Sequence, residues 1–326
     1  NNNNELIMAT YKEIFGKKVQ SLVSDPPAAA SVGQIWYNTT SQTFKTTEPV
    51  YAWAAGGSMT NARADGTGSG GILTAGFYTG ADTSPGANNL TEEYDGTSWS
   101  GGGAQNTTAA QRIGFGTLTA GVTAAGYSPG AISAVEEYNG TSWTSVTSMP
   151  ETGWDRIGCG IETSGLVWAG APFGVTTTWE YGGTSWTAGG TSPAVRNTTG
   201  NGATQDAAFM VGGETPGFSN QAATYNGTSW STVTVYPISR AGVMSNGPNT
   251  DTIAAGGNPP TASTNSNKWD GSAWTAAPAI GTGRYDGGRF GTGTAAVIAG
   301  GTNGPAAQTA TEEFTGTDTV RTITTS

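Results

Sequence analysis

The feature that most constrains the fold is a short motif that recurs along the chain at a nearly constant interval. One copy reads Glu137-Tyr138-Asn139-Gly140-Thr141-Ser142-Trp143, and decayed or intact copies surround residues 94, 181, 225, 269 and 314. The intact copies end in Trp99, Trp143, Trp186, Trp230 and Trp274, so the period is 43 to 44 residues. A fixed period in this range is typical of architectures in which each repeat forms one supersecondary unit.

Each repeat carries the signals of four short strands. Asn-Gly or Asp-Gly between two apolar runs predicts a hairpin, because both turn residues must tolerate positive φ. A small apolar run that ends in glycine precedes each hairpin, and one arginine followed by a glycine-rich strand stands upstream of that run. These arginines are Arg63, Arg112, Arg156, Arg196, Arg240 and Arg284. Four strands in about 44 residues predict one β-propeller blade.

The repeat resembles the kelch repeat, in which a glycine pair closes the second strand and Tyr and Trp follow at fixed offsets. The glycine pair is intact at Gly212-Gly213, Gly256-Gly257 and Gly300-Gly301, whereas the earlier repeats retain one glycine of it. The resemblance covers about residues 50 to 325. It implies an all-β fold, a six-bladed kelch-like β-propeller over residues 50–326, preceded by a small N-terminal anchor segment.

The two ends of the repeat region complement each other. Trp53 stands ten residues before Arg63, as in a Trp strand whose own blade is missing, and the last repeat has Asp318 where Trp is expected. We expect the strand around residues 51–55 to lie in the final blade and close the ring, because closure removes exposed sheet edges. The alternative places residues 320–324 as the outer strand of that blade, with Trp53 packed outside it.

The first 49 residues differ in composition from the repeats. Residues 1–7 read as a polar leader, and residues 8–49, which hold four of the chain's five lysines, read as an anchor segment. Within it, Gly33 to Lys45 predicts a β-hairpin with aromatic residues on both strands. This hairpin resembles a short element of phage tail and fibre proteins that precedes a repetitive domain, which implies contact with other virion proteins through residues 8–49.

Composition and charge exclude several classes of function. A net charge of −10 and a pI of about 4.4 argue against a nucleic-acid partner. No apolar run approaches the roughly 18 residues of a membrane helix, so we expect no membrane insertion. The chain has no histidine, which removes Ser-His-Asp catalysis and His-based metal sites, and we expect no cofactor and no metal. The single cysteine, Cys159, is predicted to be a buried filler.

The repeated polar and aromatic residues have structural interpretations. Trp53 and the five repeat tryptophans are expected to fill the wedge between adjacent blades. The arginines are expected to bond acids or carbonyls at blade junctions, although a ring of them near the channel could bind an anion. The acid pairs at 92/93, 136/137 and 312/313 are expected to be solvated or paired with arginine, because neighbours on a strand face opposite sides.

Variable loops are predicted to gather on one face. The loops between the second and third strands, and those between successive blades, vary in length and hold aromatic residues, whereas the other turns are short. Such loops commonly carry binding residues. The candidate ligand-binding residues are Tyr78, Tyr127, Trp154, Phe173, Phe218 and Tyr236. Their alternative role is packing over their own blades.

These features favour a non-enzymatic structural or binding protein of a virion, such as a phage tail-fibre, tail-associated or capsid-decorating protein. Its propeller loops would attach to a cell-surface glycan or protein, and a homo-oligomer is compatible with this role. One alternative is a bacterial secreted or surface adhesin, located outside the cell rather than in a virion. Another is a glycan-active propeller enzyme of the sialidase or lyase type, which predicts clustered acids or tyrosines at the channel mouth.

Overall fold

The computed structural model shows an all-β chain and describes residues 19–65, 68–83, 86–172, 175–192, 204–215, 217–258, 261–304 and 306–324. Its helices in these ranges are two single 3₁₀ turns, η1 (Ala28–Ala30) and η2 (Gln205–Ala207). Neither is long and apolar enough to cross a membrane. The chain divides into two compact units, residues 1–52 with 316–326, and residues 53–315.

The first unit contains both the N-terminal segment and the C-terminal tail. Strands β2 (Ile35–Asn38) and β3 (Thr43–Ala55) form the hairpin expected over residues 33–45, and β1 (Gln20–Leu22) pairs with β2 in parallel. Asp25 fixes one side of the hairpin by accepting hydrogen bonds from Trp36 Nε1 at 3.0 Å and Asn38 Nδ2 at 2.7 Å. The tail joins this unit because Ile323 N donates to Phe44 O at 2.9 Å. The unit therefore includes residues 316–326, which the sequence analysis assigned to the propeller.

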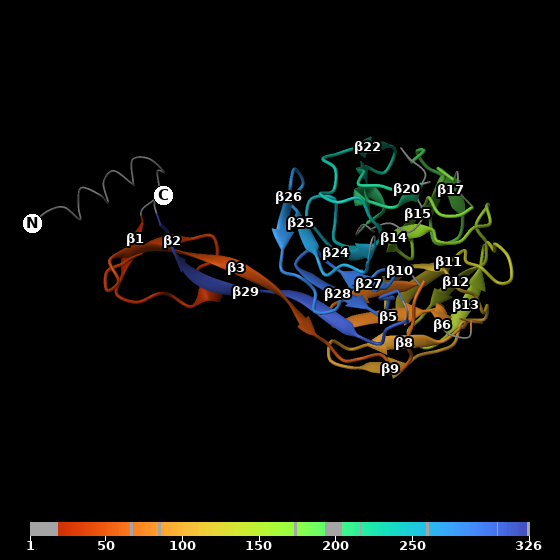
Figure 1. Cartoon of the computed structure of the whole chain (residues 1–326), viewed down its shortest axis with the longest axis horizontal. Coiled ribbons are helices and arrows are strands. Elements are labelled where there is room, and N and C mark those ends of the chain that lie inside the picture. The colour runs from red at the N-terminus through yellow and green to blue at the C-terminus, as the bar shows by residue number, and fades with distance from the viewer. Residues whose placement is uncertain are drawn as a thin grey trace, which may run out of the picture. The chain divides into compact units, whose positions relative to one another are not determined.

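The second unit consists of antiparallel sheets of three or four strands that follow the sequence repeats (Figure 1). The first sheet is β4 (Ser69–Ile72), β5 (Ala75–Thr79), β8 (Thr91–Tyr94) and β9 (Trp99–Gly101). The second sheet is β10 (Ile113–Thr117), β11 (Ala120–Ala124), β12 (Val135–Tyr138) and β13 (Trp143–Val146). The third sheet is β14 (Ile157–Ile161), β15 (Ser164–Trp168), β16 (Thr178–Tyr181) and β17 (Trp186–Ala188).

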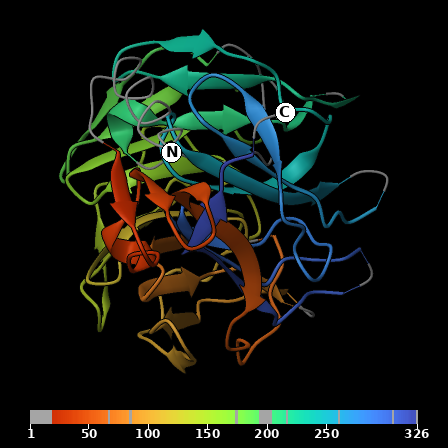
Figure 2. The ribbon, with the colours of Figure 1, turned by 90° about the vertical axis from the view of Figure 1, so that its left-hand side faces the viewer.

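The fourth sheet has three described strands, β18 (Phe209–Val211), β21 (Ala222–Tyr225) and β22 (Trp230–Thr232). The fifth sheet is β23 (Ala241–Asn246), β24 (Thr252–Asn258), β25 (Ser266–Trp269) and β26 (Trp274–Ala277). Two short hairpins extend from loops between second and third strands: β6 (Asp82–Thr83) with β7 (Gly86–Ala87), and β19 (Glu214–Thr215) with β20 (Gly217–Phe218). The strand colours in Figure 2 run around this unit from orange through green to blue.

The last sheet is completed by a strand from the start of the repeat region. Its order is β27 (Gly288–Gly291), β28 (Ala295–Ala299), β29 (Thr311–Thr322) and then β3. In the second unit, Gly56 N donates to Thr311 O at 2.9 Å, and the rings of Trp53 and Phe314 lie 5.1 Å apart. The expected placement of residues 51–55 in the final sheet is confirmed. The alternative is wrong, because Val320 belongs to the same strand as Thr311 rather than to an outer one.

The turn of the repeat motif differs from the two-residue hairpin expected. Tyr138 pairs directly with Trp143, so four residues form the loop. Gly140 has a φ of 88°, but Asn139 is not among the described residues with positive φ. Instead the Asn139 side chain accepts hydrogen bonds from the N–H groups of Thr141 and Ser142, both at 2.9 Å. The motif therefore uses glycine for its backbone and, except in the third sheet where Gly182 stands at that position, Asn or Asp as an acceptor.

Each described sheet packs against the next through a cluster of buried side chains. Phe77 of the first sheet contacts Trp143 of the second, and similar clusters join the second to the third, the third to the fourth, the fourth to the fifth and the fifth to the last. The last sheet also packs against the first, because Phe290 lies in one cluster with Tyr94 and Trp99. Trp99 and Trp143 are buried, and the other repeat tryptophans are half-buried. The expected packing between sheets is confirmed.

A tyrosine–glutamate hydrogen bond recurs between neighbouring sheets. The repeat tyrosine donates its hydroxyl hydrogen to the glutamate that precedes the equivalent aromatic residue of the previous sheet, which is Tyr or, in the last sheet, Phe314. The bonded pairs are Tyr94 with Glu313, Tyr138 with Glu93, Tyr181 with Glu137 and Tyr225 with Glu180. The first of these pairs joins the first sheet to the last, in the same way that the others join successive sheets.

The described repeat arginines are buried and bonded within their own sheets. Arg63, Arg112 and Arg284 form ion pairs with Glu92, Glu136 and Glu312 at 3.0, 2.7 and 2.8 Å. Arg156 pairs with Glu151 at 3.1 Å, and Arg240 donates to Gly256 O at 2.9 Å. The predicted bonding to acids and carbonyls is found, but within a repeat rather than at the junction between neighbouring blades. Arg196 lies outside the described residues.

Removing one of the recurring hydroxyls should cost a modest amount of stability. Tyr138→Phe deletes the donor to Glu93 and an acceptor for Gly103 N at 3.2 Å, while the ring contacts stay. We expect a loss of about 1.5–3 kcal/mol in unfolding free energy, because the bond is to a charged acceptor. Urea unfolding checks this, with Tyr37→Phe as the control, since the Tyr37 hydroxyl has no bond in the described chain. Equal midpoints for both variants would contradict it.

Candidate functional site

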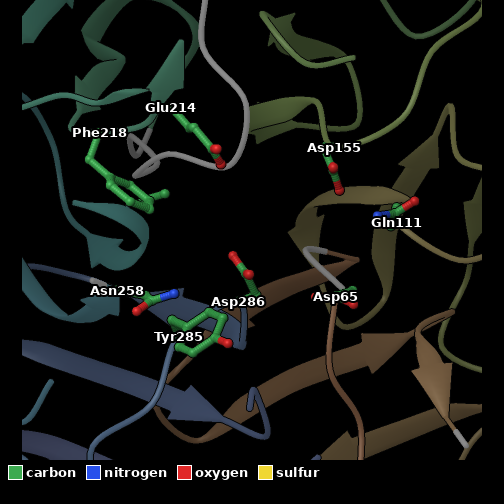
Figure 3. Close-up of a pocket in the computed structure, with 9 residues that line it drawn as sticks. Asp65, Gln111, Asp155, Glu214, Phe218, Asn258, Tyr285 and Asp286 are labelled. Carbon is green, nitrogen blue, oxygen red and sulfur yellow. The ribbon is translucent and has the colours of Figure 1, made fainter. Parts of the chain in front are cut away.

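The second unit contains a cavity of about 240 Å³ to which every sheet contributes (Figure 3). Its lining residues come from the segments just before first strands, from the β19–β20 hairpin, and from the ends of β23 and β24. They are Asp65, Gln111, Asp155, Glu214, Phe218, Ala241, Asn258, Tyr285 and Asp286. Because residues 65, 111, 155, 214, 258 and 286 belong to successive sequence repeats, the cavity lies where these repeats meet.

Backbone hydrogen bonds between neighbouring sheets fix several of these residues in place. Gln111 N donates to Asp65 O at 3.1 Å, Asp155 N to Gln111 O at 3.3 Å, and Asp286 N to Gly242 O at 3.2 Å. Four non-glycine residues of the cavity lining, Asp65, Gln111, Asp155 and Asp286, form its rim and have φ between 49° and 55°. Left-handed backbone is uncommon outside glycine and clusters at functional sites. The rim is therefore a repeated and constrained structure rather than a set of loose loops.

The cavity is strongly acidic. Figure 3 shows the carboxyl groups of Asp155 and Asp286 directed into it. Burial raises the pKa of Asp155 to about 7, and the charges of Asp65 and Glu214 add to the rise. Burial also raises the pKa of Asp286 well above its ordinary value, with help from Asp65 and Asp155 and against the opposing charge of Arg289. Around neutral pH some of these carboxyl groups therefore hold protons.

This arrangement can donate or accept protons and can attract cations. Carboxyl groups with raised pKa values in a cavity are typical of binding and catalytic sites, although structural networks also perturb pKa values. Among the described residues, no group of three acids or cysteines is placed to hold a metal ion. The ring of Tyr285 and the ring of Phe218, which is 41% exposed, supply apolar surface beside the acids.

Three of the candidate ligand-binding residues lie at or beside this cavity. Phe218 lines it. Tyr127 is 43% exposed, and its ring meets the ring of half-buried Trp154 edge to face at 5.5 Å. Trp154 directly precedes the cavity residue Asp155, and Tyr127 forms a β-bridge with Ala110, which precedes Gln111. Tyr127 and Trp154 are thus backbone neighbours of cavity residues, but of the three candidates only Phe218 lines the cavity.

Two further candidates are not available as surface groups. Tyr78 and Tyr236 are fully buried, so their proposed place on the exposed loop face is wrong. Tyr78 lies within β5 and packs in the cluster between the first and last sheets, and Tyr236 packs edge to face on Trp274 at 4.8 Å. For these two the alternative of packing over the blades is correct. Phe173 lies outside the described residues.

The sequence analysis missed the acids of the cavity. Asp155 directly precedes a repeat arginine, and Asp65 and Asp286 follow repeat arginines by two residues. Polar residues flanking the arginine in several repeats were a usable signal, because equivalent positions in a ring of repeats approach one another near its axis. The acids named from the sequence were the adjacent pairs at 92/93, 136/137 and 312/313, and these are bonded within the fold.

A second cavity, of about 220 Å³, is lined by the first strands themselves. Ser69, Cys159 and Arg289 contribute to it, together with glycines and the half-exposed Ile72 and Ile161. Cys159 is buried, as expected for a structural residue, and its thiol donates to Thr204 O at 3.3 Å. This cavity carries fewer charged groups, and the acidic cavity remains the stronger candidate site.

Comparisons with known proteins bear on the fold only. No protein-family model matches the chain, and no curated protein matches it. A solved structure titled "Structure of YjhT" superposes with a TM-score of 0.66 at 15% sequence identity, and the match covers 81% of this chain and 99% of that one. At this identity the likeness shows a shared fold and nothing about ligand or activity.

Proposed function

We propose that this chain is a non-enzymatic binding protein of a virus particle, a phage tail-fibre, tail-associated or capsid-decorating protein. The observation that carries the binding role is the cavity to which every repeat contributes, with the partly exposed ring of Phe218 in its lining. Converging side chains at one constrained rim suit ligand recognition. The ligand would be a cell-surface glycan or protein.

The scaffold of this role is a six-bladed kelch-like propeller. Its support is the order of packing, in which each sheet contacts the next and the last contacts the first. Ser69 Oγ donates to Arg289 O at 3.0 Å, which joins the first strands of the first and last sheets directly. A ring of this kind positions loops from all blades around one axis.

The first unit is the proposed attachment to other virion proteins. Its support is the tail-fibre-like hairpin together with exposed apolar side chains, since Val23 is 77% exposed, Val32 51% and Ile35 40%. Apolar side chains exposed in one small unit are typical of protein contact surfaces.

Mass spectrometry of purified particles tests the proposal. Particles made by the genome that encodes this chain should contain it in stoichiometric amount, and particles lacking it should adsorb poorly to host cells. Recovery of the chain from the surface of a bacterial cell, with none in particles, would contradict the proposal and favour the adhesin.

A glycan-active enzyme is the second candidate, because one specific observation favours it. Clustered acids do stand at the cavity, and Asp155, with a pKa of about 7, could act as a general acid. Turnover of a broad glycan panel tests this. An enzyme would cleave at least one glycan and lose that activity in Asp155→Asn, whereas the binding protein we propose leaves the whole panel intact.

A further inference from the structure

The charge of the acidic cavity selects what can enter it. Four of its nine lining residues are carboxylic acids, and none of the nine is lysine or arginine. Arg289 supplies an opposing charge that acts on Asp286. Where these acids are ionised they would repel an anionic ligand such as a sugar acid and attract a cation, and a bound cation would in turn favour their ionised form.

Two of these carboxyl groups differ from the paired acids of the fold. Glu136 is a paired acid, because it accepts hydrogen bonds from Arg112 at 2.7 Å and from Asn106 N at 2.7 Å. The side chains of Asp155 and Asp286 are half-buried and accept no hydrogen bond from the described residues, although burial shifts the pKa of both. A carboxyl group placed in this way is satisfied by water or by a bound ligand. Figure 3 shows both groups turned toward the cavity.

The cavity fits an organic cation better than a metal ion. The acids are not grouped as metal ligands among the described residues. Instead they share the cavity with the rings of Phe218 and Tyr285, and aromatic faces beside acids favour ammonium groups. The volume of about 240 Å³ suits a small head group or one sugar ring rather than a polymer segment.

We propose that this cavity binds an ammonium group carried by the ligand, either an amino sugar or a quaternary ammonium head group. The proposal rests on the proposed binding function and specifies its ligand chemistry. Asp155 and Asp286 supply the opposing charge, and Tyr285 and Phe218 supply the ring surface.

Matched probes that differ only in charge test this on the full chain. Calorimetry at about pH 8 would compare choline with 3,3-dimethyl-1-butanol, its uncharged carbon isostere, and at about pH 7 would compare glucosamine with glucose. We expect at least one charged probe to bind about tenfold or more tighter than its neutral partner, a difference of about 1.4 kcal/mol. The pair that shows the difference identifies the source of the ammonium group.

Variants then locate the binding. Asp286→Asn and Asp155→Asn should each abolish the preference for the charged probe, and Asp206→Asn should leave it intact. Asp206 is a matched control because it lies exposed on η2, away from the cavity, and its change alters the net charge equally. Thermal unfolding of each variant shows that it is folded.

The outcomes separate this inference from the function on which it rests. Equal binding of charged and neutral probes, no binding of any charged probe, or a preference that survives in both cavity variants would overturn the ammonium site. If the chain is found in particles and binds neutral or acidic glycans, the binding function stands while the inference fails. If the probes bind as expected but particles lack the chain, the ammonium site stands while the proposed virion function fails.

Discussion

Arg112→Met is expected to lower the unfolding free energy by about 3–5 kcal/mol, because it leaves Glu136 charged and buried. Both side chains are fully buried, and Arg112 Nη1 lies 2.7 Å from Glu136 Oε1. Arg112 also donates to Ala134 O at 3.1 Å. Burial disfavours the charged form of Glu136, yet its bond to Arg112 and the charge of Arg112 lower its pKa below the ordinary value. The ion pair therefore stabilises the fold fully at pH values above the pKa of glutamate in the unfolded chain. This contribution is lost as the pH falls from there through the lower pKa of Glu136 in the folded protein.

Urea unfolding followed by circular dichroism measures this effect. Arg321→Met is the control, because Arg321 and Glu48 are 54% and 60% exposed and 3.9 Å apart, so its loss should cost about 0–1 kcal/mol. Glu136→Gln added to Arg112→Met should recover part of the loss, since it removes the unpaired charge while keeping an acceptor for Asn106 N. Equal midpoints for Arg112→Met and Arg321→Met would contradict the buried pair.

Asp155→Asn is expected to stabilise the protein above about pH 7 by up to about 4 kcal/mol, the equivalent of a pKa raised from 3.8 to about 7. The folded state holds the Asp155 proton more tightly than the unfolded chain does. The stability that this proton contributes is fully present below about pH 4 and is lost as the pH rises to about 7. Asparagine has the same shape without the charge, so it removes this dependence.

Thermal unfolding midpoints between about pH 4 and pH 8 measure the effect. The difference between Asp155→Asn and the unmodified chain should grow with pH and level off above neutrality. Asp206→Asn, on an exposed turn, should give a curve parallel to that of the unmodified chain. A constant difference across the pH range for Asp155→Asn would mean that its carboxyl group is not desolvated.

The sequence alone predicted the parts of the fold that depend on local pattern. The 43- to 44-residue period, the hairpin motif and the glycine-ended apolar runs locate most described strands of the second unit. The repeat tryptophans are buried or half-buried between sheets and the described repeat arginines are buried, because large rings and paired charges at a fixed period have few other stable positions. The hairpin over residues 33–45 also forms as expected.

The parts that failed depend on contacts between distant segments. Residues 316–326 lie with the N-terminal unit because β29 continues beyond the last sheet alongside β3, and no local pattern encodes that continuation. Tyr78 was expected in a loop, but β5 continues to Thr79, and the ring of Tyr78 packs against Gly288, whose missing side chain makes room for it. The acids of the cavity come from segments up to 221 residues apart, from Asp65 to Asp286, and only the packing of successive sheets brings them together.

The central claim is that the last sheet lies beside the first as closely as the second does. Spin labels can measure the spacing between these sheets in a Cys159→Ala background. The labelled positions are Ile72, Thr117 and Thr292, which are exposed and equivalent and lie at the ends of first strands. Double electron–electron resonance should give the same narrow distance distribution for two pairs of labels. One pair is 72 and 292, from the first and last sheets, and the other is 72 and 117, from the first and second sheets. A clearly longer or broader distance for 72 and 292 would mean that the sheets form an open arc, and the shared cavity would not exist.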